Sequence, residues 1–169
     1  MFISEFGACL TEAACTQEIS QVANVSDDAL VGWAYWEFKT YKDLTTSAGT
    51  GEEGFYNADG SLQDWKVKAL ARSYLMAAQG VPTLFNFDME SSAFEAEFTV
   101  DTSIQAPTIL FASKEYYYPN GTQVTITVDG VELTTSQVEY FETDDNHMKI
   151  TVTDSTLSGK TVRIVCVAL

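Results

Sequence analysis

A single glutamate follows the first apolar segment of the chain, where a carboxylate could act in catalysis. Residues 1–4 have the pattern of a short strand, and Glu5 comes directly after it. Alternation along a strand places Glu5 on the face opposite to Phe6. A carboxylate at the end of a buried parallel strand is costly unless it is paired or used chemically. The pattern makes Glu5 a catalytic candidate, and the alternative is a solvated glutamate near a frayed N-terminus.

A second apolar segment, residues 29–38, carries aromatic side chains that could bind a ligand beside Glu5. Alternation predicts that Trp36 faces the same space as Glu5, whereas Trp33 lies on the other face of its strand. Aromatic rings stack on the C–H-rich faces of sugars, so a tryptophan beside a carboxylate is typical of a glycosidase subsite. We expect Trp36 to contact the substrate, with Trp33 as the weaker candidate. Core packing is the alternative for both rings.

Other polar residues give weaker signals. Four charged residues follow the second apolar segment and could line the mouth of the same site: Glu37, Lys39, Lys42 and Asp43. The run of residues 144–146 lacks the glycine and the distant glutamate of a calcium-binding EF-hand loop, so it is interpreted as a turn. The single histidine, His147, has no nucleophile motif beside it, which argues against serine-hydrolase chemistry.

The three cysteines do not form a CxxC pair, so no structural zinc site is predicted. Cys9 and Cys15 could bridge across a short loop or remain two separate thiols. Cys166 stands in an apolar run and is expected in the core.

Glu5 and Trp36 can act together only if secondary-structure elements bring the ends of their two predicted strands close to each other. Residues 1–82 have the pattern of strand, helix, strand, loop and helix, which makes two β/α units. Helices are predicted over 16–24 and over 61–79, where an apolar stripe stops before Gly80 and Pro82. Because the second strand is apolar on both faces, it is expected to be buried on both sides, as in a parallel sheet covered by helices.

Residues 83–169 have a different pattern, rich in Thr, Val, Ile, Phe and Tyr. Strands are predicted at 83–87, 93–100, 108–112, 124–128, 138–141, 148–152 and 161–167. The dipeptide Asp129-Gly130 is a strong hairpin signal. Short strands at spacings of roughly 8–12 residues predict an antiparallel β-sandwich. The three tyrosines at 116–118 form an aromatic cluster near a turn that could meet a sugar or a membrane interface.

Composition and length limit the function further. The 169 residues carry a net charge of −15 and are 46% hydrophobic, which is enough apolar material for a packed core. A pI near 4.1 argues against nucleic acid as a partner and disfavours attachment to anionic lipid. No apolar run reaches the roughly 18 residues of a membrane span. A whole eight-stranded α/β barrel takes about 250 residues, so these 169 residues are too few to form one. The start of the chain lacks the pattern of a signal peptide.

Two of these segments resemble a known enzyme family. Residues 2–9, Phe-Ile-Ser-Glu-Phe-Gly-Ala-Cys, resemble the strand-seven nucleophile motif of clan-A retaining glycosidases, and more narrowly the endoglycoceramidase-related branch of glycoside hydrolase family 5. Residues 32–39, Gly-Trp-Ala-Tyr-Trp-Glu-Phe-Lys, resemble strand eight of that branch. Residues 59–63, 68–74 and 80–82 resemble its last barrel helix and exit.

The resemblance implies an α/β plus all-β chain. Residues 1–82 would be the C-terminal portion of a TIM (β/α)8 barrel, comprising strands seven and eight with their helices. Residues 83–169 would be an antiparallel, immunoglobulin-like β-sandwich. This assignment agrees with the β/α pattern of residues 1–82 and with the short-strand pattern of residues 83–169.

The family resemblance also implies a retaining mechanism, in which Glu5 is the nucleophile and a second glutamate is the acid/base, about 5–5.5 Å away. That acid/base belongs to an Asn-Glu-Pro motif, which these 169 residues lack. We therefore expect the chain to be the C-terminal piece of a longer enzyme and inactive by itself. The implied substrate is a glycosphingolipid, with β-glucans and sterol glucosides as the family's alternatives.

The resemblance implies no metal or organic cofactor, and a secreted, lysosomal or lumenal location for the parent protein. The sequence leaves peripheral contact with membrane lipid and the oligomeric state open. The competing interpretation is a non-catalytic module, in which the sandwich binds carbohydrate or a lipid surface and the first 80 residues are a relic. In a third interpretation the sandwich is purely structural and packs on the flank of the barrel.

Overall fold

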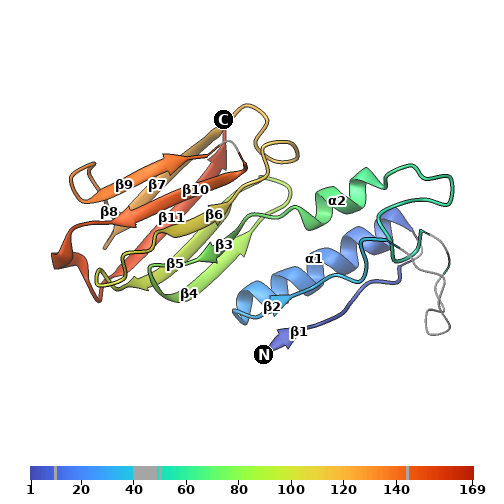
Figure 1. Cartoon of the computed structure of the whole chain (residues 1–169), viewed down its shortest axis with the longest axis horizontal. Coiled ribbons are helices and arrows are strands. Elements are labelled where there is room, and N and C mark those ends of the chain that lie inside the picture. Colours follow the sequence, from blue (N-terminus) through green and yellow to red (C-terminus); the bar gives the residue numbers. More distant parts are fainter. Residues whose placement is uncertain (10, 40–48, 50, 144) are drawn as a thin grey trace. The chain divides into compact units, whose positions relative to one another are not determined.

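A parallel pair of strands with a helix between them opens the chain (Figure 1). Strand β1 (Phe2–Ile3) pairs in parallel with β2 (Gly32–Trp33), and α1 (Glu12–Asp28) connects them. Thr11 caps α1, because its hydroxyl accepts a hydrogen bond from the Ala14 amide at 3.3 Å. One face of α1 is buried, and its residues are Cys15, Ile19, Ala23 and Ser26.

The computed structural model describes every residue except 10, 40–48, 50 and 144. The chain forms two compact units, Met1–Ala71 and Arg72–Leu169, which we call unit 1 and unit 2. The division predicted from the sequence, between residues 82 and 83, falls inside a strand of unit 2. Among the described residues, no helix is long and apolar enough to cross a membrane.

The predicted helix over 61–79 is wrong in its second half. Helix α2 covers Asp64–Leu70 only, and the chain then continues as strand β3 (Tyr74–Ala77). Two buried polar contacts explain the break. The Ser73 hydroxyl lies 2.9 Å from the Tyr118 hydroxyl, and the side chain of Gln79 donates to the carbonyl of Val152 at 3.2 Å. Pairing within the sandwich therefore overrides the helical spacing of the apolar residues.

The second predicted strand, residues 29–38, is also shorter in the structure. Ala29 is the C-cap of α1, and Ala29 and Leu30 form the turn after the helix, where the amide of Leu30 donates to the carbonyl of Asp27 at 3.0 Å. The expected burial on both faces is not observed, since Trp33 and Tyr35 are only half-buried. In the described residues β2 has β1 as its one strand partner, so its other edge is not covered by a strand.

Unit 2 is an antiparallel β-sandwich of two sheets, as the spacing of the short strands predicts (Figure 1). One sheet has the order β3-β6-β10-β9 and the other β4-β5-β11-β7-β8. The remaining strands are β4 (Gly80–Phe87), β5 (Phe94–Val100), β6 (Thr108–Phe111), β7 (Thr122–Val128), β8 (Val131–Glu132), β9 (Val138–Glu142), β10 (His147–Val152) and β11 (Thr161–Ala168), with a 3-10 helix at Ser155–Leu157.

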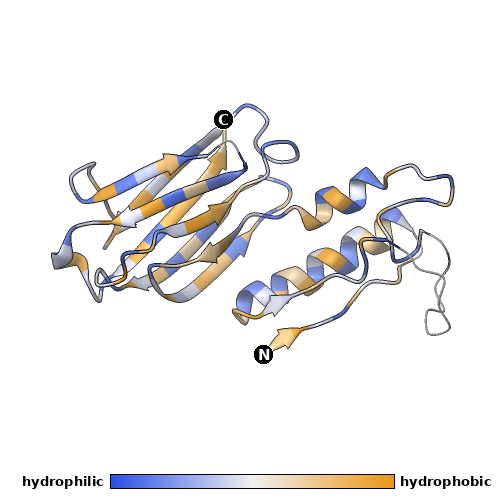
Figure 2. Cartoon of the chain, in the orientation of Figure 1, coloured by the Kyte–Doolittle hydropathy of each residue, from blue (hydrophilic) through white to orange (hydrophobic). Residues whose placement is uncertain are grey.

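Alternating side chains build the core of the sandwich. Figure 2 shows hydrophilic and hydrophobic residues alternating along its strands. In β5, Phe94, Ala96 and Phe98 are each at most 1% exposed, whereas the intervening residues are partly exposed. Cys166 is fully buried, which confirms its predicted place in the core. The hairpin predicted at residues 129–130 joins β7 to β8, and both turn residues have positive φ.

The tyrosine cluster at 116–118 is mostly core and does not form the exposed aromatic surface that the sequence suggested. Tyr117 is 3% exposed and Tyr118 is 1% exposed. The Tyr117 ring packs edge-on against Phe87, and the Tyr118 hydroxyl donates to the carbonyl of Ser92 at 2.8 Å. Burial raises the pKa of Tyr117 to about 12. The cluster therefore gives no support to a sugar- or membrane-binding role.

Candidate functional site

The carboxyl ends of β1 and β2 bring the candidate catalytic residue and its aromatic neighbour to one edge. Beyond the two paired strands, the amide of Ala34 donates to the carbonyl of Ile3 at 2.9 Å, and that of Trp36 to Phe6 at 2.8 Å. The parallel alignment therefore continues past Glu5. Glu5 is exposed and Trp36 is 40% exposed, so both side chains are accessible in this unit.

The ring of Trp33 packs against Phe6. Phe6 contacts Trp33 edge-on at 5.5 Å between ring centroids, and it contacts Tyr35 in the same way at 5.4 Å. Burial is the main cause that raises the pKa of Tyr35 to about 12, and the charges of Glu18 and Glu53 add to it. The packing of Trp33 explains why it is the weaker candidate for contact with a ligand.

Gly7 allows the backbone after Glu5 to approach the backbone after β2. Its φ is +152°, and a Cβ atom built on it would lie 2.1 Å from the carbonyl oxygen of Trp36. Only glycine fits such an approach without movement of the backbone. The spacing of Glu5 and Trp36 along the two segments thus depends on the absence of a side chain at Gly7. The Trp36–Glu37 peptide bond is cis.

A disulfide fixes the segment that follows Gly7. Cys9 and Cys15 are bonded, with their Cα atoms 5.1 Å apart, which decides between the two alternatives that the sequence left open. Cys15 is 1% exposed in the buried face of α1. The bond ties the end of the Glu5 segment to the first turns of the helix behind it.

A buried lysine holds the loop that packs beside the segment after Trp36. The Lys66 ammonium of α2 donates to the carbonyls of Gly51, Glu52 and Gly54 at 3.2, 3.1 and 2.9 Å. The side-chain amide of Gln63 donates to Gly51 and Gly54 as well. Burial lowers the pKa of Lys66, and the three carbonyls compensate its charge in part.

The clamped loop contacts the residues next to Trp36 through its backbone. The amide of Glu37 donates to the carbonyl of Glu53 at 3.4 Å, and that of Phe55 donates to Phe38 at 3.0 Å. Glu37 is 6% exposed, so its side chain does not line an open mouth, whereas Lys39 is exposed. Lys42 and Asp43 lie outside the described residues. No pattern in the sequence predicts the contacts of Lys66, because a lysine in a short helix is ordinarily solvated.

We expect Lys66→Met to loosen this loop and to destabilise unit 1 by about 1–3 kcal/mol, because the Glu52 carbonyl loses the ammonium donor and the carbonyls of Gly51 and Gly54 keep only Gln63. Hydrogen exchange of the amides at Gly51 to Phe55, measured by mass spectrometry on the whole chain, checks the prediction. Lys68→Met is the matched control, since Lys68 lies on the same helix and is exposed. Equal exchange in the two variants would contradict the role given to Lys66.

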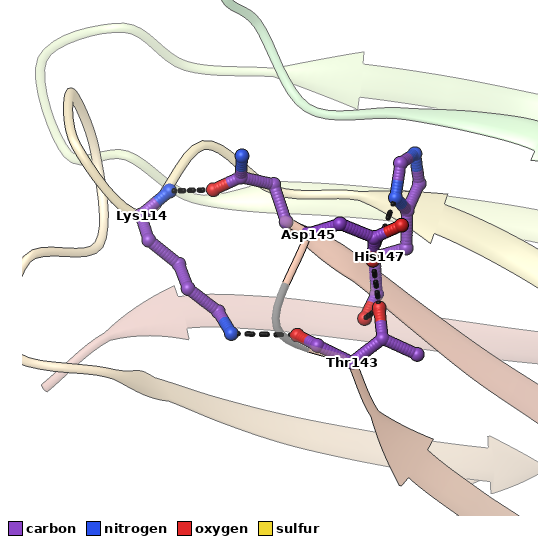
Figure 3. A network of polar contacts seen from close by, with 5 residues as sticks. Lys114, Thr143, Asp145 and His147 are labelled. Carbon is purple, nitrogen blue, oxygen red and sulfur yellow. Dashed lines mark hydrogen bonds and ion pairs between the residues drawn. The ribbon is translucent and has the colours of Figure 1, made fainter.

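The single histidine is the first residue of β10 and contacts the turn before that strand. Figure 3 shows His147 with Lys114, Thr143 and Asp145 at the β9–β10 connection. Nδ1 of His147 lies 3.1 Å from the Asp145 carboxylate, and the Thr143 hydroxyl donates to Asp145 and to the main-chain carbonyl of His147. The Lys114 ammonium donates to the carbonyl of Thr143 at 2.7 Å. These contacts close the turn that the sequence predicts at residues 144–146, of which 145 and 146 are described.

Within the described residues, no group of three or more His, Cys, Asp or Glu side chains is placed to hold a metal ion. At this edge of unit 1 the accessible groups are the Glu5 carboxylate and the Trp36 ring.

A comparison with protein families matches residues 72–166, more than half of the chain, to the glycoside hydrolase family 5 C-terminal domain. The chain belongs to that family. The family 5 C-terminal domain begins at Arg72, which is also the first residue of unit 2. No curated protein sequence matches the chain.

Solved structures with the same fold cover both units. Endo-glycoceramidase II from Rhodococcus sp., as its five-membered iminocyclitol complex, aligns with 99% of this chain at 21% identity and a TM-score of 0.67. Its ganglioside GM3 complex aligns at 20% identity and 0.68. Sterylglucosidase 1 from Cryptococcus neoformans, with tris, aligns with 99% of this chain at 13% identity and 0.69. The chain spans 33%, 32% and 28% of these structures, respectively.

Proposed function

We propose that this chain is the C-terminal part of a retaining β-glycosidase and that unit 1 is the last two β/α units of an eight-stranded barrel. The observation that carries the proposal is the parallel pairing of β1 with β2, which brings Glu5 and Trp36 to the carboxyl ends of adjacent strands. Barrel enzymes hold their catalytic residues at that end. The similar structures are about three times as long as this chain, which leaves room for the other strands.

In the proposed reaction the Glu5 carboxylate attacks the anomeric carbon, and the bond to the leaving-group oxygen breaks as that oxygen takes a proton. The proton comes from an acid/base glutamate outside these 169 residues. Water then attacks the glycosyl ester, returns the proton to that second carboxylate and frees Glu5. Trp36 stacks on the sugar ring, with Trp33 as the weaker candidate. Two carboxylates suffice for this chemistry, so it needs no metal or cofactor.

The proposed substrate is a glycolipid, with a glycosphingolipid first and a sterol glucoside second. The names of the similar enzymes, an endo-glycoceramidase and a sterylglucosidase, support a lipid aglycone. The Cys9–Cys15 disulfide supports a secreted or lumenal location, because such bonds persist in oxidising compartments.

Covalent labelling tests the proposal. A 2-deoxy-2-fluoro-β-glucoside should label the longer gene product, and peptide mapping should find the sugar on Glu5. The 169-residue chain by itself should not hydrolyse a fluorogenic β-glucoside. A label on another carboxylate would refute the assignment of Glu5, and turnover by the isolated chain would refute the need for further strands.

A further inference from the structure

Unit 2 has a groove at the open side of its sandwich, formed entirely by residues of that unit. Its volume is about 500 Å³, within the range of small-molecule sites. The lining residues come from β7, β8, β9 and the connection between the last two: Val124, Ile126, Glu132, Leu133, Thr135, Val138, Glu139, Tyr140 and Phe141.

The groove exists because the two sheets are not closed by a strand on this side. Strand β8 has two residues and pairs with β7 only at Thr127 and Val128. Among the described strands, β8 and β9 are the last of their sheets (Figure 1). Side chains that would otherwise be core therefore remain accessible, and Val124 is half-buried while Tyr140 is 38% exposed.

Tyr140 contributes its ring to the groove, and its hydroxyl is engaged elsewhere. That hydroxyl donates to the Glu142 carboxylate at 2.7 Å, and the hydroxyl of Thr122 donates to the same carboxylate at 2.9 Å. The bond from Tyr140 is the main cause that lowers the pKa of Glu142. A fixed, apolar ring surface results, because the polar end of the side chain is already satisfied.

Apart from Thr135 and Phe141, the remaining lining residues are aliphatic within the groove and acidic at its edge. Ile126 and Val138 are 7% and 8% exposed and form the floor together with Val124. The two charged lining residues are Glu132 and Glu139, both exposed, and no lysine or arginine lines the groove. A sugar on the ring of Tyr140 would need several converging polar groups around it, whereas Val124, Ile126 and Val138 surround the inner part of the groove. Branched aliphatic side chains instead suit a hydrocarbon chain, and the carboxylates oppose a negatively charged head group.

We propose that this groove binds the alkyl chain of an amphiphile whose head group is uncharged or cationic. The inference rests on unit 2 alone and is independent of the role proposed for Glu5.

The test uses four probes on the whole chain, all below their critical micelle concentrations: octyl glucoside, octyltrimethylammonium, octyl sulfate and methyl glucoside. Two-dimensional NMR of the labelled protein reports both the affinity and the residues affected. The neutral and the cationic octyl compounds should bind saturably and shift amides of β7, β8 and β9. Octyl sulfate should bind at least about tenfold more weakly, and methyl glucoside should not bind.

A matched pair of variants locates the site. Leu133→Glu puts a carboxylate into the groove, whereas Val131→Glu puts one on the neighbouring hairpin, where Val131 is 69% exposed and lines no part of the groove. The first should weaken octyl glucoside binding at least about tenfold, and the second should leave it unchanged. Phe141→Ser, at a side chain that is 62% exposed, serves as a second variant should Leu133→Glu fail to fold.

Three results would overturn the proposal: no saturable binding of octyl glucoside, binding that Leu133→Glu and Phe141→Ser both leave intact, or equal binding of methyl glucoside. A groove that ignores the octyl compounds but takes up an extended peptide would also overturn it, since the open edges of β7 and β9 would then be the recognised feature.

Discussion

Glu5→Ala in the longer gene product should abolish β-glycoside hydrolysis, with a loss in kcat on the order of 10⁴- to 10⁶-fold, the scale seen when a covalent nucleophile is removed from other hydrolases. The reason is that no glycosyl-enzyme can form without the carboxylate. Steady-state kinetics with a dinitrophenyl β-glucoside measure the loss. KM should change little, because in the proposed reaction Glu5 acts on the reacting carbon and Trp36 binds the sugar ring.

Azide distinguishes a lost nucleophile from a damaged fold. In Glu5→Ala, azide should enter the space left by the carboxylate, attack the anomeric carbon and expel the dinitrophenolate, which gives an α-glycosyl azide with partial recovery of turnover. Glu12→Gln is the control, since Glu12 is an exposed carboxylate at the start of α1, and it should keep full activity. A Glu5→Ala protein that retains turnover, or a β-configured azide product, would contradict the nucleophile assignment.

The sequence predicted in part the elements that carry the candidate site, through two short apolar segments. The two apolar runs predicted the parallel segments whose carboxyl ends carry Glu5 and Trp36. The faces assigned to Glu5, Trp36 and Trp33 by alternation stay predictions. The supports of the site were not predictable. The Lys66 clamp depends on carbonyls 12 to 15 residues away in the sequence, and no local pattern specifies such contacts.

Elements of the fold that depend on local sequence patterns were predicted correctly, whereas elements that depend on distant contacts were not. The sandwich strands were predictable because their alternation agrees with the final burial, as in β5. The helix over 61–79 failed because Ser73 and Gln79 have buried partners far along the chain, at Tyr118 and Val152. Helical periodicity cannot reveal such partners, and tertiary contacts outweigh intrinsic propensity.

Gly80→Ala should be the most destabilising single-methyl change in unit 2, costing at least about 3 kcal/mol. Gly80 has a φ of +152°, and a Cβ atom on it would lie 1.9 Å from the carbonyl oxygen and 2.9 Å from the carbonyl carbon of Thr99. Both contacts are to the backbone of the paired strand β5, which cannot move aside as a flexible side chain can. Strand β4 would have to separate from β5 at this point or shift its register.

Gly130→Ala separates this clash from the cost of positive φ alone. Gly130 has a φ of +77°, and nothing lies within 4 Å of a Cβ atom built there, so the change should cost only about 1 kcal/mol. Calorimetry of the whole chain should show the unit 2 transition lowered by more than about 10 °C in Gly80→Ala, with lost hydrogen-exchange protection in β4 and β5. Similar melting temperatures for the two variants would mean that β4 does not approach β5 as closely as the structure places it.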